Sequence, residues 1–361
     1  MNELTNIFNS DKSFVTESGC TVKNPKIAYR SWGTLNENRS NVVVVNHALT
    51  GNADADEWFS GLFGTGKALD PSRHFIICMN VPGSCYGSTG PWSKRADTQQ
   101  PWKADFPSLT IRDLVRFQQL LLDGWNITGI EFVIGGSMGG MQALEFAIMD
   151  NRVRKVIPIA IGKAHTPWAI GISHTQRQAI FRDPKWQDGY YEQGDGPENG
   201  LAIARMIAMV SYRSPDDYQQ KFGRSLQPDS PQFQIESYLN YQGDKLVKRF
   251  DALSYVRLSE AMDTHDLSRG RDSFNKVLNR VQQPALVIGI DSDKLYPVEE
   301  QKELAELLGN SQYEELQSPH GHDAFLIEFE QLNECIVPFI EQGNPSSVVS
   351  GSPEDRSAEF G

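Results

Sequence analysis

The chain has 361 residues, 39% of them hydrophobic and 22% charged, and it carries a formal net charge of −12 at pH 7. This length predicts about two domains, or one large domain with an insertion, at roughly 150 residues per domain. The acidic balance, without any Lys/Arg cluster, argues against nucleic acid and anionic membranes as partners. The sequence has no apolar window of about 18 residues for a membrane span, and MNELTNIFNSDKSF has no signal-peptide pattern, so we expect a cytoplasmic protein.

The cysteines are few and scattered along the chain. Cys20, Cys78, Cys85 and Cys335 form no CxxC pair. This spacing favours neither a disulfide framework nor a metal site, so we expect no bound metal. Cys78 lies within an apolar run and is predicted to belong to the core.

Short apolar runs separated by helical patterns predict an α/β fold. The apolar runs are continuous rather than alternating, which is typical of parallel strands covered on both faces. KIAYRSW, residues 26–32, precedes the first of these runs and is interpreted as an antiparallel edge strand. Helical patterns at residues 110–125 and 141–150 lie between them, so helices are expected on both faces of the sheet. The predicted buried strands are residues 41–46, 74–81, 131–135, 155–162 and 285–290.

The segment GGSMGG, Gly135 to Gly140, matches G-x-S-x-G around Ser137. An apolar run leads into it and a helical pattern leads out, which is the setting of a nucleophile elbow. Glycines on either side of the serine leave room for strand and helix to approach closely. Ser137 is therefore the predicted nucleophile. The alternative is a glycine-rich turn with an incidental serine, and a phosphate loop is disfavoured because G-x-x-x-x-G-K-[ST] is absent.

The strand–helix alternation stops between about residues 163 and 281. This region is rich in Gln, Asp, Arg and aromatic residues, with helical pieces such as residues 200–214 and 254–264. We interpret it as a helical cap inserted between two strands of the sheet. The predicted organisation is a core of residues 1–162 and 282–342, a cap of residues 163–281 and a disordered Ser/Gly/Pro-rich tail of residues 343–361.

A serine nucleophile needs a base, and after an elbow of this kind an acid and then a histidine follow in chain order. Asp291 and Asp293 both follow the strand at residues 285–290. A turn-forming role is the alternative for each. We favour Asp293, which would orient the histidine and stabilise its imidazolium form.

The candidate histidines lie in SPHGHDAF, after the strand-like QYEEL. We favour His322 over His320, and a surface-loop histidine is the alternative for both. His265 belongs to the cap region. His47 precedes Ser137 and is expected to hydrogen-bond within its own loop.

An oxyanion hole needs two convergent backbone N–H groups. One is expected at Met138, directly after the nucleophile. The other is expected at Leu49, in the loop NHALTG that follows the strand at residues 41–46.

Eight segments, taken in order, resemble the homoserine O-acetyltransferase family of the α/β-hydrolase superfamily. The resemblance runs from about residue 15 to about residue 340. Eight motifs in the right order are far more specific than G-x-S-x-G alone. The segments are NHALTGNAD, NVPGSCYGSTGP, FPSLTIRDLVRFQQLLLD, GGSMGGMQALEFA, RQAIFRDPKW, GLAIARMIAMVSYRS, KFGR and SPHGHDAFL.

The resemblance implies an α/β-hydrolase fold with a mostly parallel central sheet, helices on both faces and an inserted helical cap. It implies ping-pong transfer of the acetyl group of acetyl-CoA to the hydroxyl of L-homoserine through a Ser137 acyl-enzyme, in methionine biosynthesis. Acetyl-CoA would be a co-substrate, with no bound cofactor, and cap helices would form a homodimer. The absence of a further basic residue beside LTG or GGSMGG favours an acetyl over a succinyl donor. Alternatives are an O-succinyltransferase acting on homoserine or serine, a cap-bearing serine hydrolase and a non-catalytic binding module.

The resemblance also implies that Arg205 and Tyr212 hold the amino acid and that Asp323 binds its ammonium group. Arg205 and Tyr212 are seven residues apart, so they share one helix face. An arginine in an apolar helix needs a partner, and a substrate carboxylate or a cap carboxylate can supply it. The alternative for Asp323 is the N-cap of the following helix. The residues that bind CoA are not assigned.

Overall fold

The computed structural model describes residues 5–342, so the predicted tail at residues 343–361 lies outside the described residues. Its core is an eight-stranded sheet in the order β1-β4-β6-β5-β7-β8-β9-β10. β1 and β4 pair antiparallel, as do β4 and β6, and all strands from β6 to β10 run parallel. The strands are β1 (Asn6–Asn9), β4 (Lys26–Trp32), β5 (Val42–Asn46), β6 (Phe75–Met79), β7 (Ile130–Gly136), β8 (Val156–Ile159), β9 (Ala285–Ile290) and β10 (Ser311–Leu316), with β2 (Phe14–Val15) and β3 (Thr21–Val22) forming a separate pair.

The five predicted buried strands are confirmed as β5 to β9, all parallel. The prediction for KIAYRSW is right about its antiparallel pairing and wrong about its position at the edge. β1 pairs with its outer side and forms the edge instead. The NIFN segment of β1 is mostly exposed, so it carries no apolar run that would mark it as a strand.

The continuous apolar runs follow from burial on both sheet faces. In β5, Val42 and Val44 belong to one buried cluster, and Val43 and Val45 belong to the other. Helices α2, α3 and α10 pack on the first face, and α1, η1 and α11 cover the second. These elements are α1 (Ala55–Trp58), η1 (Ser60–Leu62), η2 (Lys103–Asp105), α2 (Ile111–Gly124), α3 (Met138–Met149), α10 (Val298–Leu307), η4 (Gly321–Leu326) and α11 (Phe329–Glu341).

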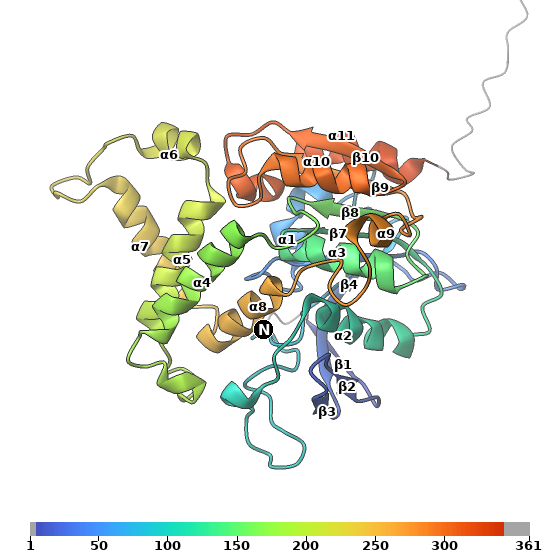
Figure 1. Ribbon diagram of the computed structural model, residues 1–361, viewed down its shortest axis with the longest axis horizontal. Helices are drawn as coiled ribbons and strands as arrows, with labels where there is room; N and C mark the ends of the chain where they lie inside the picture. The colour runs from blue at the N-terminus through green and yellow to red at the C-terminus, as the bar shows by residue number, and fades with distance from the viewer. Residues whose placement is uncertain (1–4, 343–361) are drawn as a thin grey trace, which may run out of the picture.

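The chain between β8 and β9 is helical. In Figure 1, α4, α5, α6 and α7 stand to the left of the sheet, and α8 lies between them and the core. α9 packs against α10 of the core. These elements are α4 (Pro167–Phe181), η3 (Gln187–Gly189), α5 (Glu198–Tyr212), α6 (Pro215–Phe222), α7 (Gln234–Val247), α8 (Ala252–Asp263) and α9 (Phe274–Leu278). Among residues 5–342, no helix is long and apolar enough to cross a membrane.

Candidate active site

Ser137 occupies a sharp turn between β7 and α3. Its backbone has φ 56° and ψ −126°, a conformation that is strained for a residue with a side chain. The Ser137 N–H donates to the Ile159 carbonyl at 3.0 Å. Its own carbonyl accepts from Gly140 N at 2.8 Å and Met141 N at 3.1 Å, which starts α3. Hydrogen bonds to β8 and within α3 thus maintain the strained backbone conformation of Ser137, as in a nucleophile elbow.

The surrounding glycines allow three backbone segments to approach one another. A Cβ atom at Gly135 would lie 2.5 Å from the backbone of Gly139. A Cβ at Gly139 would overlap the Asn46 carbonyl oxygen, and one at Gly136 would lie 2.5 Å from the Phe325 ring. The close approach of strand and helix that the motif indicates is therefore present, and side chains at these positions would displace the turn.

His322 and Asp293 form a buried pair. The His322 Nδ1 donates to Asp293 Oδ2 at 2.7 Å, and both side chains are almost fully buried. Asp293 directly follows the turn after β9, and its Oδ1 accepts from the backbone N–H groups of Leu295 at 2.8 Å and Tyr296 at 3.0 Å. The His322 Nε2 is buried and makes no hydrogen bond within residues 5–342. Asp293 therefore fixes the ring through Nδ1 and leaves Nε2 for proton transfer.

The environment of His322 favours its protonated form. Burial lowers the pKa of His322, but the charge and hydrogen bond of Asp293 outweigh it, so the pKa lies above its ordinary value of 6.5. The charge of Asp323 acts in the same direction. An imidazole held in this way can take up a proton and return it.

Asp291 and His320, the alternatives to Asp293 and His322, have other hydrogen-bond partners. Asp291 is exposed, and its Oδ1 accepts from Ser318 N at 3.0 Å. His320 donates from Nδ1 to Asp217 Oδ1 at 2.7 Å. The bonded pair is thus His322 with Asp293. His47 is a buried loop residue, with Nδ1 bonded to the Ala48 carbonyl at 2.8 Å and Nε2 accepting from Val81 N at 3.2 Å.

A pocket of about 580 Å³ lies between core and cap. It brings together residues from β7, α5, η4 and the loop after β5. Met138, at the start of α3, and Asp293 are not among the residues that line it, and both are buried. The predicted site residues that line the pocket are Leu49, Ser137, Arg205, Tyr212, His322 and Asp323.

The predicted oxyanion donors have suitable positions. Met138 is the first residue of α3, and the first N–H groups of a helix have no partner within it. Leu49 lines the pocket from a loop whose turn is closed by Gly51 N bonding to the Ala48 carbonyl at 2.9 Å.

Arg205 and Tyr212 share one face of α5, as their spacing predicts. The Arg205 guanidinium carbon lies 5.7 Å from the centre of the Tyr212 ring, and that ring lies 5.7 Å from the His322 ring. No ion pair of Arg205 is found in the described part of the chain, so the alternative of a cap carboxylate partner is not observed. The pocket therefore contains a guanidinium group of a kind that binds carboxylates.

The N-cap interpretation of Asp323 is wrong. Asp323 lies inside η4, His320 occupies the N-cap position of that element, and Glu328 occupies the N-cap position of α11. Its Oδ2 lies 3.1 Å from Nε of Arg213. Burial raises the pKa of Asp323, and the cations Arg213 and Arg205 offset only part of this effect. A substrate ammonium would add a further favourable charge.

A set of contacts joins the cap to the histidine loop without any signal in the sequence, and we call it the cap–loop clasp. Ser214 Oγ donates to the Pro319 carbonyl. Gly321, at φ 64°, packs so closely that a Cβ would lie 2.8 Å from Ser214 N. No local pattern marks these partners, which are about a hundred residues apart. The clasp consists of the pairs Ser214–Pro319, Asp217–His320 and Arg213–Asp323.

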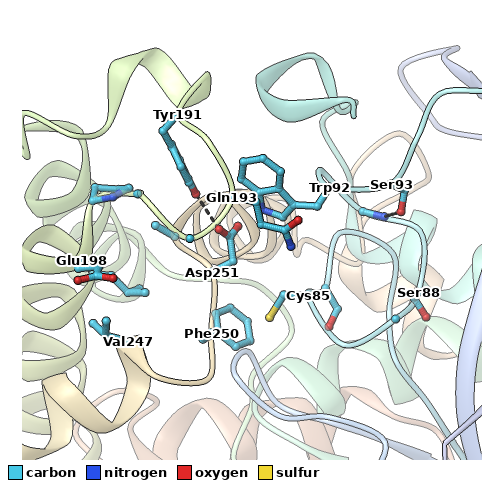
Figure 2. Close-up of a pocket in the computed structure, with 18 residues that line it drawn as sticks. Cys85, Ser88, Trp92, Ser93, Tyr191, Gln193, Glu198, Val247, Phe250 and Asp251 are labelled. Atoms are coloured by element: carbon cyan, nitrogen blue, oxygen red, sulfur yellow. Dashed lines mark hydrogen bonds between the residues drawn. The ribbon is translucent and has the colours of Figure 1, made fainter. Parts of the chain in front are cut away.

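A second cavity, of about 320 Å³, lies between the loop at residues 84–93 and the cap segments at residues 191–201 and 247–252 (Figure 2). Tyr191 donates to Asp251 Oδ2 at 2.8 Å within it (Figure 2). None of the predicted site residues lines this cavity. The larger pocket is therefore the candidate active site.

A family model described as "alpha/beta hydrolase fold" matches residues 41–329. The parallel sheet, the serine at the strand–helix turn and the histidine–aspartate pair agree with that match. Fold and site together define an α/β-hydrolase-fold enzyme equipped for acyl transfer.

Within the α/β-hydrolase-fold enzymes, the chain is most informatively compared with acetyltransferases of known sequence and structure. The chain is 50% identical to a homoserine O-acetyltransferase of Chlorobium chlorochromatii over 94% of its length and 96% of the relative's. It is also 50% identical to that of Nostoc punctiforme, over 90% and 92%. The crystal structure of a Bacillus anthracis homoserine O-acetyltransferase superposes with a TM-score of 0.87 at 26% identity, covering 94% of this chain and 97% of that one. The chain belongs to the homoserine O-acetyltransferase family, and it is an acyltransferase.

Hydrolases share the architecture. Esterase E22 superposes with a TM-score of 0.86 at 25% identity, covering 93% of this chain and 99% of that one. The 50% identity to the acetyltransferases of Chlorobium chlorochromatii and Nostoc punctiforme, against 25% to the esterase, favours transfer over hydrolysis.

Proposed function

We propose that the enzyme transfers an acetyl group from acetyl-CoA to L-homoserine through an acyl-enzyme on Ser137. The observation that carries the proposal is the composition of one pocket. Ser137 and His322 lie on its core side, and Arg205 and Asp323 offer opposite charges beside them. These charges match the carboxylate and the ammonium group of an amino acid.

In the first half-reaction, His322 Nε2 accepts the proton of Ser137 as Oγ attacks the thioester carbonyl carbon. The N–H groups of Met138 and Leu49 stabilise the resulting oxyanion. The intermediate then collapses, the carbon–sulfur bond breaks, and His322 returns the proton to the departing CoA sulfur. Asp293 stabilises the imidazolium between the two transfers.

In the second half-reaction, the hydroxyl of homoserine loses its proton to His322 and its oxygen attacks the acyl carbon. The bond to Ser137 Oγ breaks, and the proton returns to Ser137. Arg205 and Tyr212 hold the substrate carboxylate, and Asp323 accepts its ammonium group. The product, O-acetyl-L-homoserine, enters methionine synthesis.

The choice of acetyl over succinyl rests on the relatives. The sequence places no basic residue beside LTG, but the fold does. Arg249, far away in the chain, donates to the Thr50 carbonyl at 2.7 Å. A basic residue therefore lies beside LTG in space, so the absence of one beside LTG in the sequence no longer argues against a succinyl donor.

Intact-protein mass spectrometry tests the ping-pong scheme. Acetyl-CoA without homoserine is expected to add one acetyl group to the wild type and none to Ser137→Ala. Homoserine added afterwards should discharge the adduct. Intersecting rather than parallel double-reciprocal plots, with no adduct, would support direct transfer instead.

We also propose a cytoplasmic location. The four cysteines are unpaired, which suits a reducing compartment. Burial raises the pKa of Cys85 and of Cys335 to about 12, so neither is readily oxidised through its thiolate.

A homodimer through the cap is a further part of the proposal. Ile203 and Val210 on one face of α5 are 47% and 57% exposed, and Tyr241 on the adjacent α7 is 60% exposed. Burying such a patch against a second copy would remove it from water. Sedimentation is expected to give twice the chain mass of 40.5 kDa, and Val210→Glu with Tyr241→Glu should give single chains. A single-chain mass for the wild type at micromolar concentration would contradict the proposal.

The cap–loop clasp predicts that His320 positions His322. We expect His320→Ala to lower kcat about tenfold, because displacement of a catalytic group by a fraction of an ångström is costly. KM for both substrates should stay within about twofold. His320→Asn should restore most of the activity, since its amide can donate to Asp217 from the place of Nδ1.

The matched control is Lys185→Gln, which breaks an exposed ion pair with Asp195 elsewhere on the cap. This variant should have unchanged kcat. A His320→Ala enzyme with a lower melting temperature and wild-type kcat would show that the clasp is only structural.

A further inference from the structure

The catalytic pocket runs from a buried end to an exposed end. Ser137 and His322 are only 6% and 2% exposed. Lys245, near the end of α7, and Arg249, just beyond it, line the same pocket and are exposed. In an acyl-CoA, a long chain separates the thioester from the phosphates. When the thioester reaches Ser137, the phosphates must therefore lie at the exposed end of the pocket.

The charges along the pocket separate into two groups. Arg205 and Asp323, beside the triad, are accounted for by the amino-acid substrate. Lys245 and Arg249 remain, and neither forms an ion pair with a carboxylate among residues 5–342. Glu57 is the exposed carboxylate among the lining residues.

Arg249 is held in place by neutral partners. Its Nη1 donates to the Thr50 carbonyl at 2.7 Å and to the Tyr86 hydroxyl at 2.8 Å. These contacts use one nitrogen and leave the rest of the guanidinium group for a ligand. A preorganised guanidinium loses less entropy when it binds a phosphate than a freely moving one.

The overall negative charge favours local cations where an anionic donor binds. A net charge of −12 disfavours the approach of a polyanion such as CoA. Lys245 lies in the last turn of α7 and Arg249 lies two residues beyond its end, and both line the same pocket. Lys248 lies between them in the chain and is also exposed, but it does not line the pocket.

From these observations we infer that Lys245 and Arg249 form a phosphate-binding pair for the acyl donor at the mouth of the catalytic pocket. The inference rests on the proposed function, because that function supplies the anionic thioester. Arg249 contributes in a second way, since its bond to Thr50 links the bound phosphates to the loop that carries Leu49.

The test compares two donors, acetyl-CoA and S-acetyl-N-acetylcysteamine, a short thioester without phosphates. Lys245→Gln and Arg249→Gln are each expected to raise KM for acetyl-CoA about tenfold, as for the loss of one charge-assisted hydrogen bond. KM for the short thioester and for homoserine should remain within about twofold. Lys248→Gln, the matched control, should behave as the wild type with both donors.

Calorimetry with CoA alone gives a second readout. CoA should bind each variant about tenfold more weakly than the wild type or Lys248→Gln. An unchanged KM for acetyl-CoA, or an equal rise for both thioesters, would overturn the inference. If the wild type transferred acetyl from neither donor, the proposed function would fail. In that case, equal CoA affinity of the wild type and all variants would also overturn the inference that Lys245 and Arg249 bind phosphate.

Discussion

The Ser137→Ala substitution is expected to lower kcat for acyl transfer by about 10⁶-fold, as loss of the nucleophile does in serine enzymes of this kind. The expectation follows from the pocket, which Ser137 lines from a strained turn and which His322, with its unbonded Nε2, also lines. Thiol release from acetyl-CoA and formation of O-acetylhomoserine should both disappear.

Folding of this variant should be intact. Alanine keeps the Cβ atom, and the backbone bonds of residue 137 to Ile159 and Met141 do not involve the hydroxyl. An unchanged melting temperature and unchanged homoserine binding would therefore confine the defect to chemistry. Residual transfer within about a hundredfold of wild type would mean that Ser137 carries no acyl group.

The Asp293→Asn substitution is expected to lower kcat by about 10⁴-fold. The carboxylate accepts the Nδ1 proton of His322 at 2.7 Å, and an amide nitrogen in its place would donate to Nδ1 instead. Nε2 would then carry the proton and could not accept one from Ser137. Asp291→Asn is the matched control, since Asp291 is exposed and, within residues 5–342, its side chain bonds only to the backbone of Ser318. It should keep kcat within about twofold.

The pH dependence of activity tests independently whether His322 acts as the base. Activity requires neutral His322, so it rises as pH increases through the pKa of His322, which lies above 6.5. Asp293 is the main cause that raises this pKa against burial. Loss of its charge in Asp293→Asn should move the rising limb to lower pH. If activity rose at the same pH in the wild type and in Asp293→Asn, a group other than His322 would control this rise.

The features that sequence predicts well here are local ones. The buried strands follow from continuous apolar runs, because both sheet faces are covered. The turn around Ser137 follows from glycines that a strand and a helix need in order to meet. Asp293 and His322 could be placed by chain order at strand ends, and the structure joins them by a hydrogen bond.

The features that were missed depend on contacts between distant segments. β1 is a strand because β4 offers it a partner, not because its own residues are apolar. Asp323 lies inside a loop that becomes a 3₁₀ helix, so the alternative role of Asp323 as the N-cap of the following helix is wrong. Arg249 reaches Thr50 only after the cap folds over the core. No spacing rule along the chain contains this information.

The central claim is acetyl transfer to homoserine, and product analysis tests it most directly. The purified protein would be incubated with L-homoserine and either acetyl-CoA or succinyl-CoA, with Ser137→Ala as the control, while thiol release and product mass are measured. The account predicts O-acetylhomoserine from the wild type alone. Succinylhomoserine as the main product would contradict the donor, and CoA release with free acetate and no O-acyl product would contradict transfer itself and support a hydrolase.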